Sequence, residues 1–265
     1  MQFQSKACCS RPPVVLAGGY NYTPKGTYTT YQGLKTYETG PQTSKRGILF
    51  IYDIFGLYIQ TLRGADILAS GFPSPLPGLH LDTSGTYRVF MPDFFKTEPA
   101  DIANYPPKTP KQFEYITNFM TGPANPANTL PLIGPLVEEL KAKNPEIESW
   151  AILGFCWGGK IAALSSQEGS VFKASAQAHP SLLDTEDAKK VVIPHVVLPS
   201  NDEVPEVMEE WVTELKKASP KSYNETFTDQ VHGWMSSRAD FENQHNFEEY
   251  LRGYRIVRAF FDEHM

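Results

Sequence analysis

The apolar residues of this chain fall into short continuous runs that alternate with longer stretches of helical spacing. The run Ile48-Leu49-Phe50-Ile51-Tyr52 has no polar interruption before its last residue, which is typical of a parallel strand buried on both faces. Residues 57–70 instead place apolar side chains at helical spacing and stop at Gly71. This alternation predicts an α/β fold, a mostly parallel central sheet with helices on both faces. The other predicted strands are 87–91, 151–153, 171–178, 191–198 and 223–228, and the other predicted helices are 130–143, 205–218 and 241–264.

The N-terminal region departs from this alternation. Residues 1–40 are rich in Gly, Pro, Tyr and Thr, and the alternating stretches 27–31 and 34–38 flank the turn signal Gln32-Gly33. These features predict an N-terminal arm followed by a β-hairpin. With 265 residues, of which 41% are hydrophobic, we expect the arm to belong to a single α/β domain spanning 1–265.

A second departure is the Pro-rich, aromatic segment 92–130, which contains a predicted short helix at 111–120. An insertion of this length over a compact sheet is usually functional. We therefore expect a lid or a pocket wall here, and a spacer loop without a role in the site is the alternative.

Composition and charge argue against nucleic acid and membranes as partners of this protein. The net charge of −6 offers no basic footprint for nucleic acid, and the apolar runs are far shorter than the roughly 20 residues of a membrane span. We expect a soluble, cytoplasmic protein that acts on a small molecule, and a monomer and a dimer are both compatible with the sequence. The three cysteines, two of them adjacent at Cys8 and Cys9, form neither a disulfide framework nor a zinc motif. No metal and no cofactor are predicted.

The segment with the clearest chemical signal is Gly154-Phe155-Cys156-Trp157-Gly158-Gly159, which lies between a short apolar run and an Ala-rich helical run. This is the strand, sharp turn and helix of a nucleophile elbow, with Cys where Ser is usual. Glycines flank the turn because side chains there would collide with the next element. The alternative for Cys156 is a buried, inert structural thiol.

Two residues further along the chain favour the catalytic interpretation. Asp202 follows a predicted strand and His232 lies in a later loop, so both fall at the carboxyl edge of a parallel sheet together with Cys156. Nucleophile, acid and histidine occur in the order of the α/β-hydrolases. His232 would take the thiol proton and Asp202 would orient the imidazole. Asp202 is the preferred acid, and its neighbour Glu203 is the alternative.

Taken together, six sequence blocks resemble the dienelactone hydrolase family of α/β-hydrolases, in a fungal-type form, from about Leu34 to Phe261. The resemblance implies the α/β-hydrolase fold, the same triad of Cys156, Asp202 and His232, and no cofactor. The blocks are Tyr52-Asp53-Ile54-Phe55-Gly56, Met91-Pro92-Asp93-Phe94-Phe95, the elbow, His179-Pro180-Ser181, Asn201-Asp202-Glu203-Val204-Pro205 and Val231-His232-Gly233-Trp234.

The resemblance also assigns residues around the nucleophile. It implies an oxyanion hole formed by the backbone N–H groups of Trp157 and Ile54. Asp53 stands where the bacterial lactone hydrolases have a thiol-activating Glu, and it is one methylene shorter, so a direct contact and a water-mediated contact with Cys156 are both open.

For substrate binding the resemblance is weaker. The bacterial enzymes hold a substrate carboxylate with arginines, whereas the strand-end block here reads Phe94-Phe95-Lys96. Arg238 and Lys96 are the candidate cations for this task, each with a solvated surface charge as the alternative. Phe94 and Phe95 are candidate pocket residues.

The expected function is hydrolysis of a lactone or a small carboxylic ester through a covalent acyl-thiol intermediate. A thioester or a polyketide lactone is an alternative substrate for the same triad. A redox-sensing or ligand-binding protein that has lost turnover is the alternative from a different class.

Overall fold

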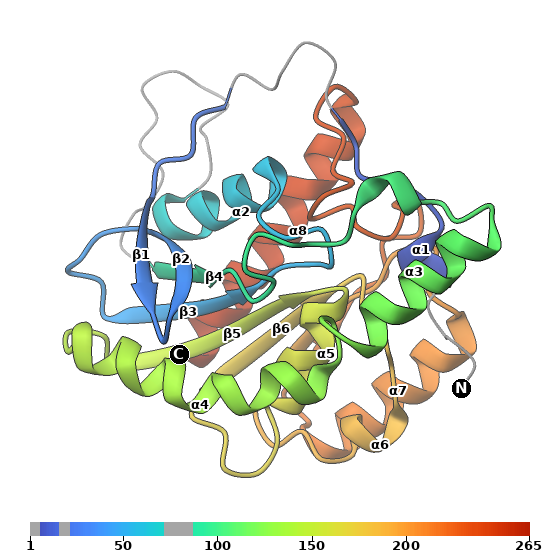
Figure 1. Cartoon of the computed structure of the whole chain (residues 1–265). Coiled ribbons are helices and arrows are strands. Elements are labelled where there is room, and N and C mark those ends of the chain that lie inside the picture. Colours follow the sequence, from blue (N-terminus) through green and yellow to red (C-terminus); the bar gives the residue numbers. More distant parts are fainter. Residues whose placement is uncertain (1–5, 16–21, 72–86) are drawn as a thin grey trace.

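A central eight-stranded sheet dominates the computed structural model, which describes residues 6–15, 22–71 and 87–265 (Figure 1). Its strand order is β1-β2-β4-β3-β5-β6-β7-β8. In the sheet, the neighbouring strands β4, β3, β5, β6, β7 and β8 pair in parallel, whereas β2 pairs antiparallel with both β1 and β4. The predicted mostly parallel α/β architecture is therefore confirmed. The strands are β1 Thr27–Tyr31, β2 Leu34–Thr39, β3 Arg46–Ile51, β4 Arg88–Pro92, β5 Ser149–Phe155, β6 Ala174–Ala178, β7 His195–Leu198 and β8 Tyr223–Asn224.

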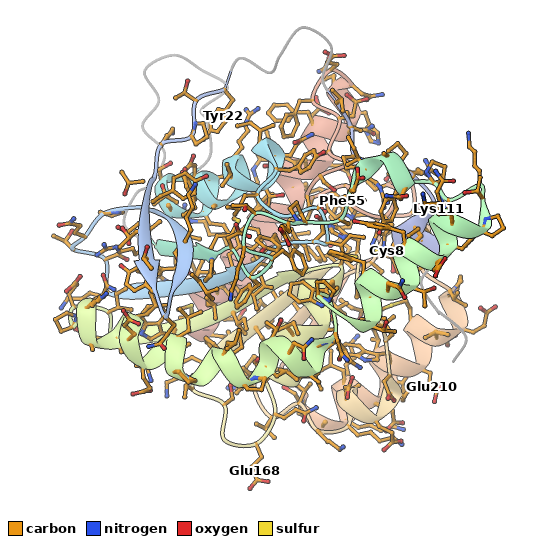
Figure 2. All side chains as sticks on the ribbon, viewed as in Figure 1. Cys8, Tyr22, Phe55, Lys111, Glu168 and Glu210 are labelled. Carbon is orange, nitrogen blue, oxygen red and sulfur yellow. The ribbon has the colours of Figure 1, made fainter. Side chains whose placement is uncertain are left out.

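Helices cover both faces of this sheet, which explains why the central strands are apolar along their whole length. Every residue of β4 is buried, and only the first residue of β3 and of β5 is partly exposed. Figure 2 shows Cys8 and Phe55 inside the molecule, whereas Glu168 and Glu210 point outward. On one face lie α2 (Ile59–Ser70) and α8 (Gln244–His264), and on the other lie α4 (Pro126–Lys143), α5 (Trp157–Leu164), α6 (Thr185–Ala188) and α7 (Pro205–Ala218) (Figure 1).

Capping moves several boundaries away from the predicted ones. The helix predicted at 130–143 begins at Pro126, because Asn125 Oδ1 accepts the Ala127 N–H at 3.0 Å and Pro suits the first helical position. The helix predicted from 241 begins only at Gln244, after the N-cap Asn243.

The predicted strands at 171–178, 191–198 and 223–228 are too long. Their ordered parts are β6, β7 and the two-residue β8. Pro194 directly precedes β7 and has no N–H for a sheet bond. The apolar pattern therefore extends beyond the paired segments.

The two irregular segments contain the elements that surround the site. The predicted hairpin is present as β1 and β2, and the described part of the arm, residues 6–15, contains the short helix α1 (Lys6–Cys9), which the sequence did not predict. The insertion holds η1 (Ile102–Asn104) and α3 (Pro110–Thr121), the latter close to the predicted helix 111–120. Within the described residues, no helix is both long enough and apolar enough to span a bilayer.

Candidate active site

Cys156 lies between the end of β5 and the start of α5, in a backbone conformation that residues with a side chain rarely adopt. Its φ is 53° and its ψ is −111°. Flanking glycines make the turn possible: an added Cβ on Gly154 would lie 1.9 Å from the Gly158 carbonyl oxygen, and one on Gly158 would lie 2.4 Å from the Ile51 carbonyl oxygen. The predicted nucleophile elbow is therefore present, with its strain concentrated at the cysteine.

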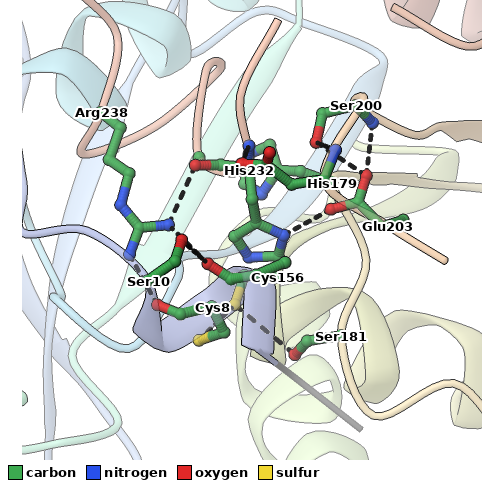
Figure 3. Close-up of polar contacts among 12 residues, drawn as sticks. Cys8, Ser10, Cys156, His179, Ser181, Ser200, Glu203, His232 and Arg238 are labelled. Carbon is green, nitrogen blue, oxygen red and sulfur yellow. Dashed lines mark hydrogen bonds and ion pairs between the residues drawn. The ribbon is translucent and has the colours of Figure 1, made fainter. Parts of the chain in front are cut away.

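The imidazole of His232 is held by a buried carboxylate. Its Nδ1 lies 2.5 Å from Glu203 Oε1, and both side chains are almost fully buried. Glu203 Oε2 accepts hydrogen bonds from the Ser200 hydroxyl at 2.9 Å and from the Ser200 backbone N–H. These bonds fix the ring, and its other nitrogen, Nε2, is buried without a hydrogen-bond partner among the described residues (Figure 3).

The prediction that Asp202 orients the imidazole is wrong in this structure. Asp202 Oδ2 instead accepts the backbone N–H of His232 at 2.9 Å, and its side chain is 21% exposed compared with 3% for Glu203. The turn after β7 directs the Glu203 side chain inward, where it bonds Ser200 and His232. Glu203, the alternative acid from the sequence, occupies the position of the third triad member.

A second sulfur lies beside Cys156. Cys8 Sγ, from α1 of the arm, is 3.2 Å from Cys156 Sγ, and both residues are 1% exposed. The sulfurs of Cys8 and Cys156 and a ring nitrogen of His232 all lie within 4.8 Å of one another. The Ser181 hydroxyl is 3.5 Å from Cys156 Sγ. No sequence motif connects Cys8 with the site, whereas Ser181 belongs to the His179-Pro180-Ser181 block.

This cluster shifts the proton affinities of its members. Burial and the hydrogen bond to Cys8 raise the pKa of the Cys156 thiol well above its ordinary value, whereas hydrogen bonds from Cys156 and Cys9 lower the pKa of Cys8. Burial disfavours the charged imidazole, but the nearby Cys8 sulfur and the Glu203 carboxylate favour it, outweigh burial and raise the pKa of His232 to about 9.

Cysteine and histidine are also zinc ligands, so the same three side chains could hold a metal ion. Two of them, Cys156 and His232, are the predicted nucleophile and base. A metal bound here would engage both groups and block their chemistry, so we assign no metal to this site.

Among the described residues, neither carboxylate oxygen of Asp53 makes a hydrogen bond to the Cys156 sulfur. Oδ2 accepts hydrogen bonds from the hydroxyls of Ser236 and Ser237, both at 2.6 Å, and Oδ1 accepts the Phe55 N–H at 2.9 Å. The carboxylate therefore fixes the loop after His232 against the end of β3. A thiol-activating role for Asp53 stays a prediction.

The predicted oxyanion-hole residues flank the elbow. Trp157 is the first residue of α5, where backbone N–H groups have no partner within the helix. An added Cβ on Gly158 would meet the carbonyl oxygens of Ile51 and Tyr52, so the start of α5 packs against the chain that leads into Ile54. The contribution of both amides stays a prediction.

Aromatic side chains pack around the elbow and include both predicted phenylalanines. Phe95 contacts Trp157 with ring centroids 4.8 Å apart, and Phe94 lies 6.3 Å from the same ring. Tyr105, from the insertion, packs against Phe55 at 5.1 Å, and its hydroxyl is buried without a hydrogen-bond partner among the described residues. The sequence did not single out Tyr105, since it lies in a Pro-rich loop without a motif.

The two candidate cations differ in their surroundings. Lys96 is exposed. Arg238 is only 4% exposed, and its guanidinium donates to the carbonyl oxygens of Cys8 at 2.6 Å, Arg11 at 3.1 Å and His232 at 2.9 Å. It is therefore not a solvated surface charge, and its donors are used by the arm and by the His232 loop (Figure 3).

A parallel sheet that presents a nucleophile elbow and an acid-bound histidine at its carboxyl edge defines an α/β-hydrolase. Residues 34–264 match the model of the dienelactone hydrolase family. The chain belongs to that family, which confirms the predicted resemblance, and it is accordingly a carboxylic ester hydrolase.

Individual relatives agree with this assignment. The chain is 32% identical over 263 residues to an uncharacterized AIM2 family protein of Schizosaccharomyces pombe. This match covers 98% of this chain and 99% of the relative. It is 26% identical over 180 residues to Dienlactone hydrolase 1 of Gibberella moniliformis, covering 64% of this chain and 61% of that protein. The solved structure of a dienelactone hydrolase from Anabaena variabilis shares the fold, with a TM-score of 0.60 at 12% identity, covering 91% of this chain and 97% of that one.

Proposed function

We propose that this protein hydrolyses a lactone or a small carboxylic ester through Cys156, His232 and Glu203, with a covalent acyl-thiol intermediate. One observation carries the proposal: Cys156 occupies a strained elbow beside a buried histidine whose Nδ1 is bonded to the Glu203 carboxylate. A nucleophile, a base and a group that orients the base are the parts of a hydrolytic triad. Membership of the dienelactone hydrolase family supports the same chemistry.

In the first half-reaction, His232 takes the thiol proton and the Cys156 sulfur attacks the carbonyl carbon. The backbone N–H groups of Trp157 and Ile54 are the proposed donors to the oxygen as it gains negative charge, and losing one such donor typically costs about 2.7 to 4 kcal/mol of barrier. The imidazolium then protonates the leaving alkoxide, which leaves a thioester on Cys156.

In the second half-reaction, neutral His232 takes a proton from water, and the resulting hydroxide attacks the thioester carbon. The Cys156 thiolate leaves, and the carboxylic acid product is released. Glu203 keeps the ring in one orientation and stabilises its charged form throughout, as the acid of a triad does. No cofactor takes part in this sequence of steps.

The surroundings of the elbow favour an uncharged substrate. Phe94, Phe95 and Trp157 offer an apolar wall, and Tyr105 adds a hydroxyl without a partner among the described residues. Arg238, which could have held a carboxylate, already donates to four carbonyl oxygens, those of Ala7, Cys8, Arg11 and His232. We therefore propose a neutral ester or lactone, with the 92–130 insertion as one wall of its pocket.

Substrate entry requires the arm to move, since Cys8 Sγ lies in contact with Cys156 Sγ, where an acyl carbon has to approach. An acyl thioester or a polyketide lactone could react at the same groups. Screening neutral lactones, simple esters and acyl thioesters at equal concentration separates these substrate classes by kcat/KM.

Rapid mixing with an activated aryl ester under reducing conditions tests the proposal. A burst of one equivalent of alcohol, together with an acyl adduct on the peptide that carries Cys156, is the expected result. Cys156→Ala should show neither. Unchanged turnover in Cys156→Ala would show that another group is the nucleophile.

A further inference from the structure

Two thiols meet in the active site, and one of them lies outside the proposed triad. Cys8 and Cys156 are 148 positions apart in the sequence, yet their sulfurs lie 3.2 Å from each other in a buried environment (Figure 3). Hydrolysis by the mechanism above needs only the Cys156 sulfur. The Cys8 thiol is therefore a buried nucleophilic group without a role in that reaction.

The position of Cys8 is fixed by contacts along the arm. Arg238 donates to the carbonyl oxygens of Cys8 and Arg11, at 2.6 and 3.1 Å, and thereby links the arm to the loop that carries His232. Further along, the Val14 N–H donates to the Ser237 carbonyl oxygen at 2.9 Å, and Gln60 Nε2 donates to the Val14 carbonyl oxygen at 3.0 Å. These bonds hold the arm against the sheet and keep the two sulfurs together.

We propose that Cys8 and Cys156 form a reversible disulfide, a redox modification site that fastens the arm over the active site. A disulfide has an S–S distance of about 2.05 Å, so the sulfurs must approach by about 1.2 Å, which is within reach of small side-chain rotations. The disulfide itself depends only on the two thiols. Its consequence, a reversible loss of hydrolysis, rests on the proposed function.

A hydroperoxide is an oxidant that balances the reaction. His232 takes the proton of the Cys156 thiol, the sulfur attacks one peroxide oxygen, the O–O bond breaks, and the sulfur becomes a sulfenic acid while hydroxide leaves. The Cys8 thiolate then attacks the sulfenyl sulfur, the S–S bond forms, and a second hydroxide leaves. Protons from the original thiols, one of them carried by His232, convert both hydroxides to water, so two thiols and one hydrogen peroxide give one disulfide and two waters.

The surroundings favour Cys8 over Cys9 as the resolving thiol. Thiolate is the attacking form in disulfide chemistry, and hydrogen bonds from Cys156 and Cys9 lower the pKa of Cys8. The hydrogen bond to Cys8, together with burial, raises the pKa of Cys9, so its thiol stays protonated. Cys9 is also only partly buried and lies outside the cluster of Cys8, Cys156 and His232.

The disulfide would also protect the nucleophile. A sulfenic acid without a nearby thiol is oxidised further to a sulfinic acid, which ordinary thiols do not reduce. With Cys8 beside it, the sulfenic acid on Cys156 is captured as a disulfide, and a thiol reductant restores both sulfurs.

Peptide mapping of the full-length protein tests this proposal. The reduced protein is freed of reductant, treated with a few equivalents of hydrogen peroxide, alkylated, and digested without reductant. Mass spectrometry should find the Cys8 peptide joined to the Cys156 peptide with the loss of two hydrogens. Dithiothreitol should separate the two peptides and restore most of the activity toward an activated ester, as expected for a disulfide.

Two variants complete the experiment. Cys9→Ser, the matched control, should form the same cross-link and recover in the same way, whereas Cys8→Ser should gain two oxygens on Cys156 and stay inactive after reduction. A map that shows only a Cys8–Cys9 bond, or no cross-linked peptide, would overturn the proposal, and so would equal recovery of Cys8→Ser. Since the wild-type map reads the bond directly, it decides the matter even if Cys8→Ser folds poorly or the protein hydrolyses no ester.

Discussion

Glu203 Oε1 lies 2.5 Å from Nδ1 of His232, and the adjacent carboxylate, Asp202, bonds the backbone N–H of the same histidine at 2.9 Å. Two neighbouring acids thus act on one residue in different ways. Glu203 orients the ring and stabilises its charge, whereas Asp202 positions the loop that carries it. The difference in role gives a direct test of the acid assignment.

Glu203→Gln keeps the shape of the side chain but removes the charge that stabilises the imidazolium. We expect kcat/KM toward an activated ester to fall by about two to four orders of magnitude, as for other triad acids. Asp202→Asn is the matched control, since it loses a partly exposed charge and can still accept the His232 N–H, and its kcat/KM should stay within about tenfold of wild type. A large loss in Asp202→Asn with a mild effect in Glu203→Gln would return the triad role to Asp202.

Tyr105→Phe tests whether the insertion contributes to the pocket. The Tyr105 hydroxyl has no hydrogen-bond partner among the described residues, so its removal breaks no bond that the free protein makes. If it donates to a bound ester, KM should rise by about five- to thirty-fold, which corresponds to about 1 to 2 kcal/mol, with an unchanged melting temperature. An unchanged KM would indicate that the ring acts only as a wall.

Elbow packing can be tested with a pair of glycine substitutions. A Cβ on Gly158 would lie 2.4 Å from the Ile51 carbonyl oxygen, a backbone atom that cannot move aside cheaply, whereas a Cβ on Gly134 would meet nothing within 4 Å. Gly158→Ala should destabilise the fold by about 2 kcal/mol or more and abolish activity. Gly134→Ala, within α4, should stabilise it by about 0.5 to 1 kcal/mol. Chemical denaturation measures both, and a stable, active Gly158→Ala would contradict the close packing at the elbow.

The sequence predicted those features whose cause is local. The continuous apolar run at 48–52 indicated a central strand because both faces of β3 are covered, and Gly154 and Gly158 indicated the elbow because side chains cannot fit there. The order of residues along the chain also placed Cys156 and His232 at one edge of the sheet, and the structure brings these two side chains together. The alternation of apolar runs and helical stretches likewise predicted the α/β fold class.

What the sequence did not predict depends on distant contacts. Asp202 and Glu203 are adjacent carboxylates, and only the turn after β7 decides which of them reaches the imidazole. Cys8 is brought to Cys156 by the bonds that Arg238 makes to the arm, and neither α1 nor its docking leaves a periodic pattern. Arg238 itself resembled a surface charge because its partners are backbone carbonyls, which no side-chain pattern reveals.

Acid pH should destabilise the protein through His195. This residue begins β7, its Nδ1 lies 2.7 Å from the Ser175 hydroxyl, and burial lowers its pKa to about 3. The unfolded chain binds a proton near pH 6.5 while the folded chain does not, so stability is lost as the pH falls from 6.5 toward 3. Between pH 6.5 and 5 the wild type should lose about 2 kcal/mol more than His195→Gln.

Urea unfolding at the two pH values measures this difference. For each protein we compare the change in the free energy of unfolding between the two pH values. The absolute stabilities are not compared, because His195→Gln itself alters packing against Trp211. Burial also lowers the pKa of His179, but that residue is present in both proteins and cancels. Equal changes in the two proteins would show that His195 is not excluded from protonation in the folded state.

Removal of residues 1–10 should increase the activity of the reduced enzyme. The arm places Cys8 against the nucleophile, and the hydrogen bond between the sulfurs raises the pKa of Cys156, so the closed form is both blocked and less reactive. An enzyme that is open for only a fraction of the time has its apparent kcat/KM reduced by that fraction. If the arm is closed about nine-tenths of the time, truncation should raise kcat/KM by about tenfold and the rate of Cys156 alkylation by iodoacetamide by a similar factor.

Full-length Cys9→Ser, which keeps Cys8 and the Arg238 contacts, should match the wild type in both assays. A truncated protein that is folded by circular dichroism but less active would mean that the arm forms part of the substrate pocket. Faster alkylation without faster hydrolysis would mean that removing the arm makes the Cys156 thiol more accessible but does not help the ester to bind or react. Only a joint increase supports an arm that competes with substrate for the space beside Cys156.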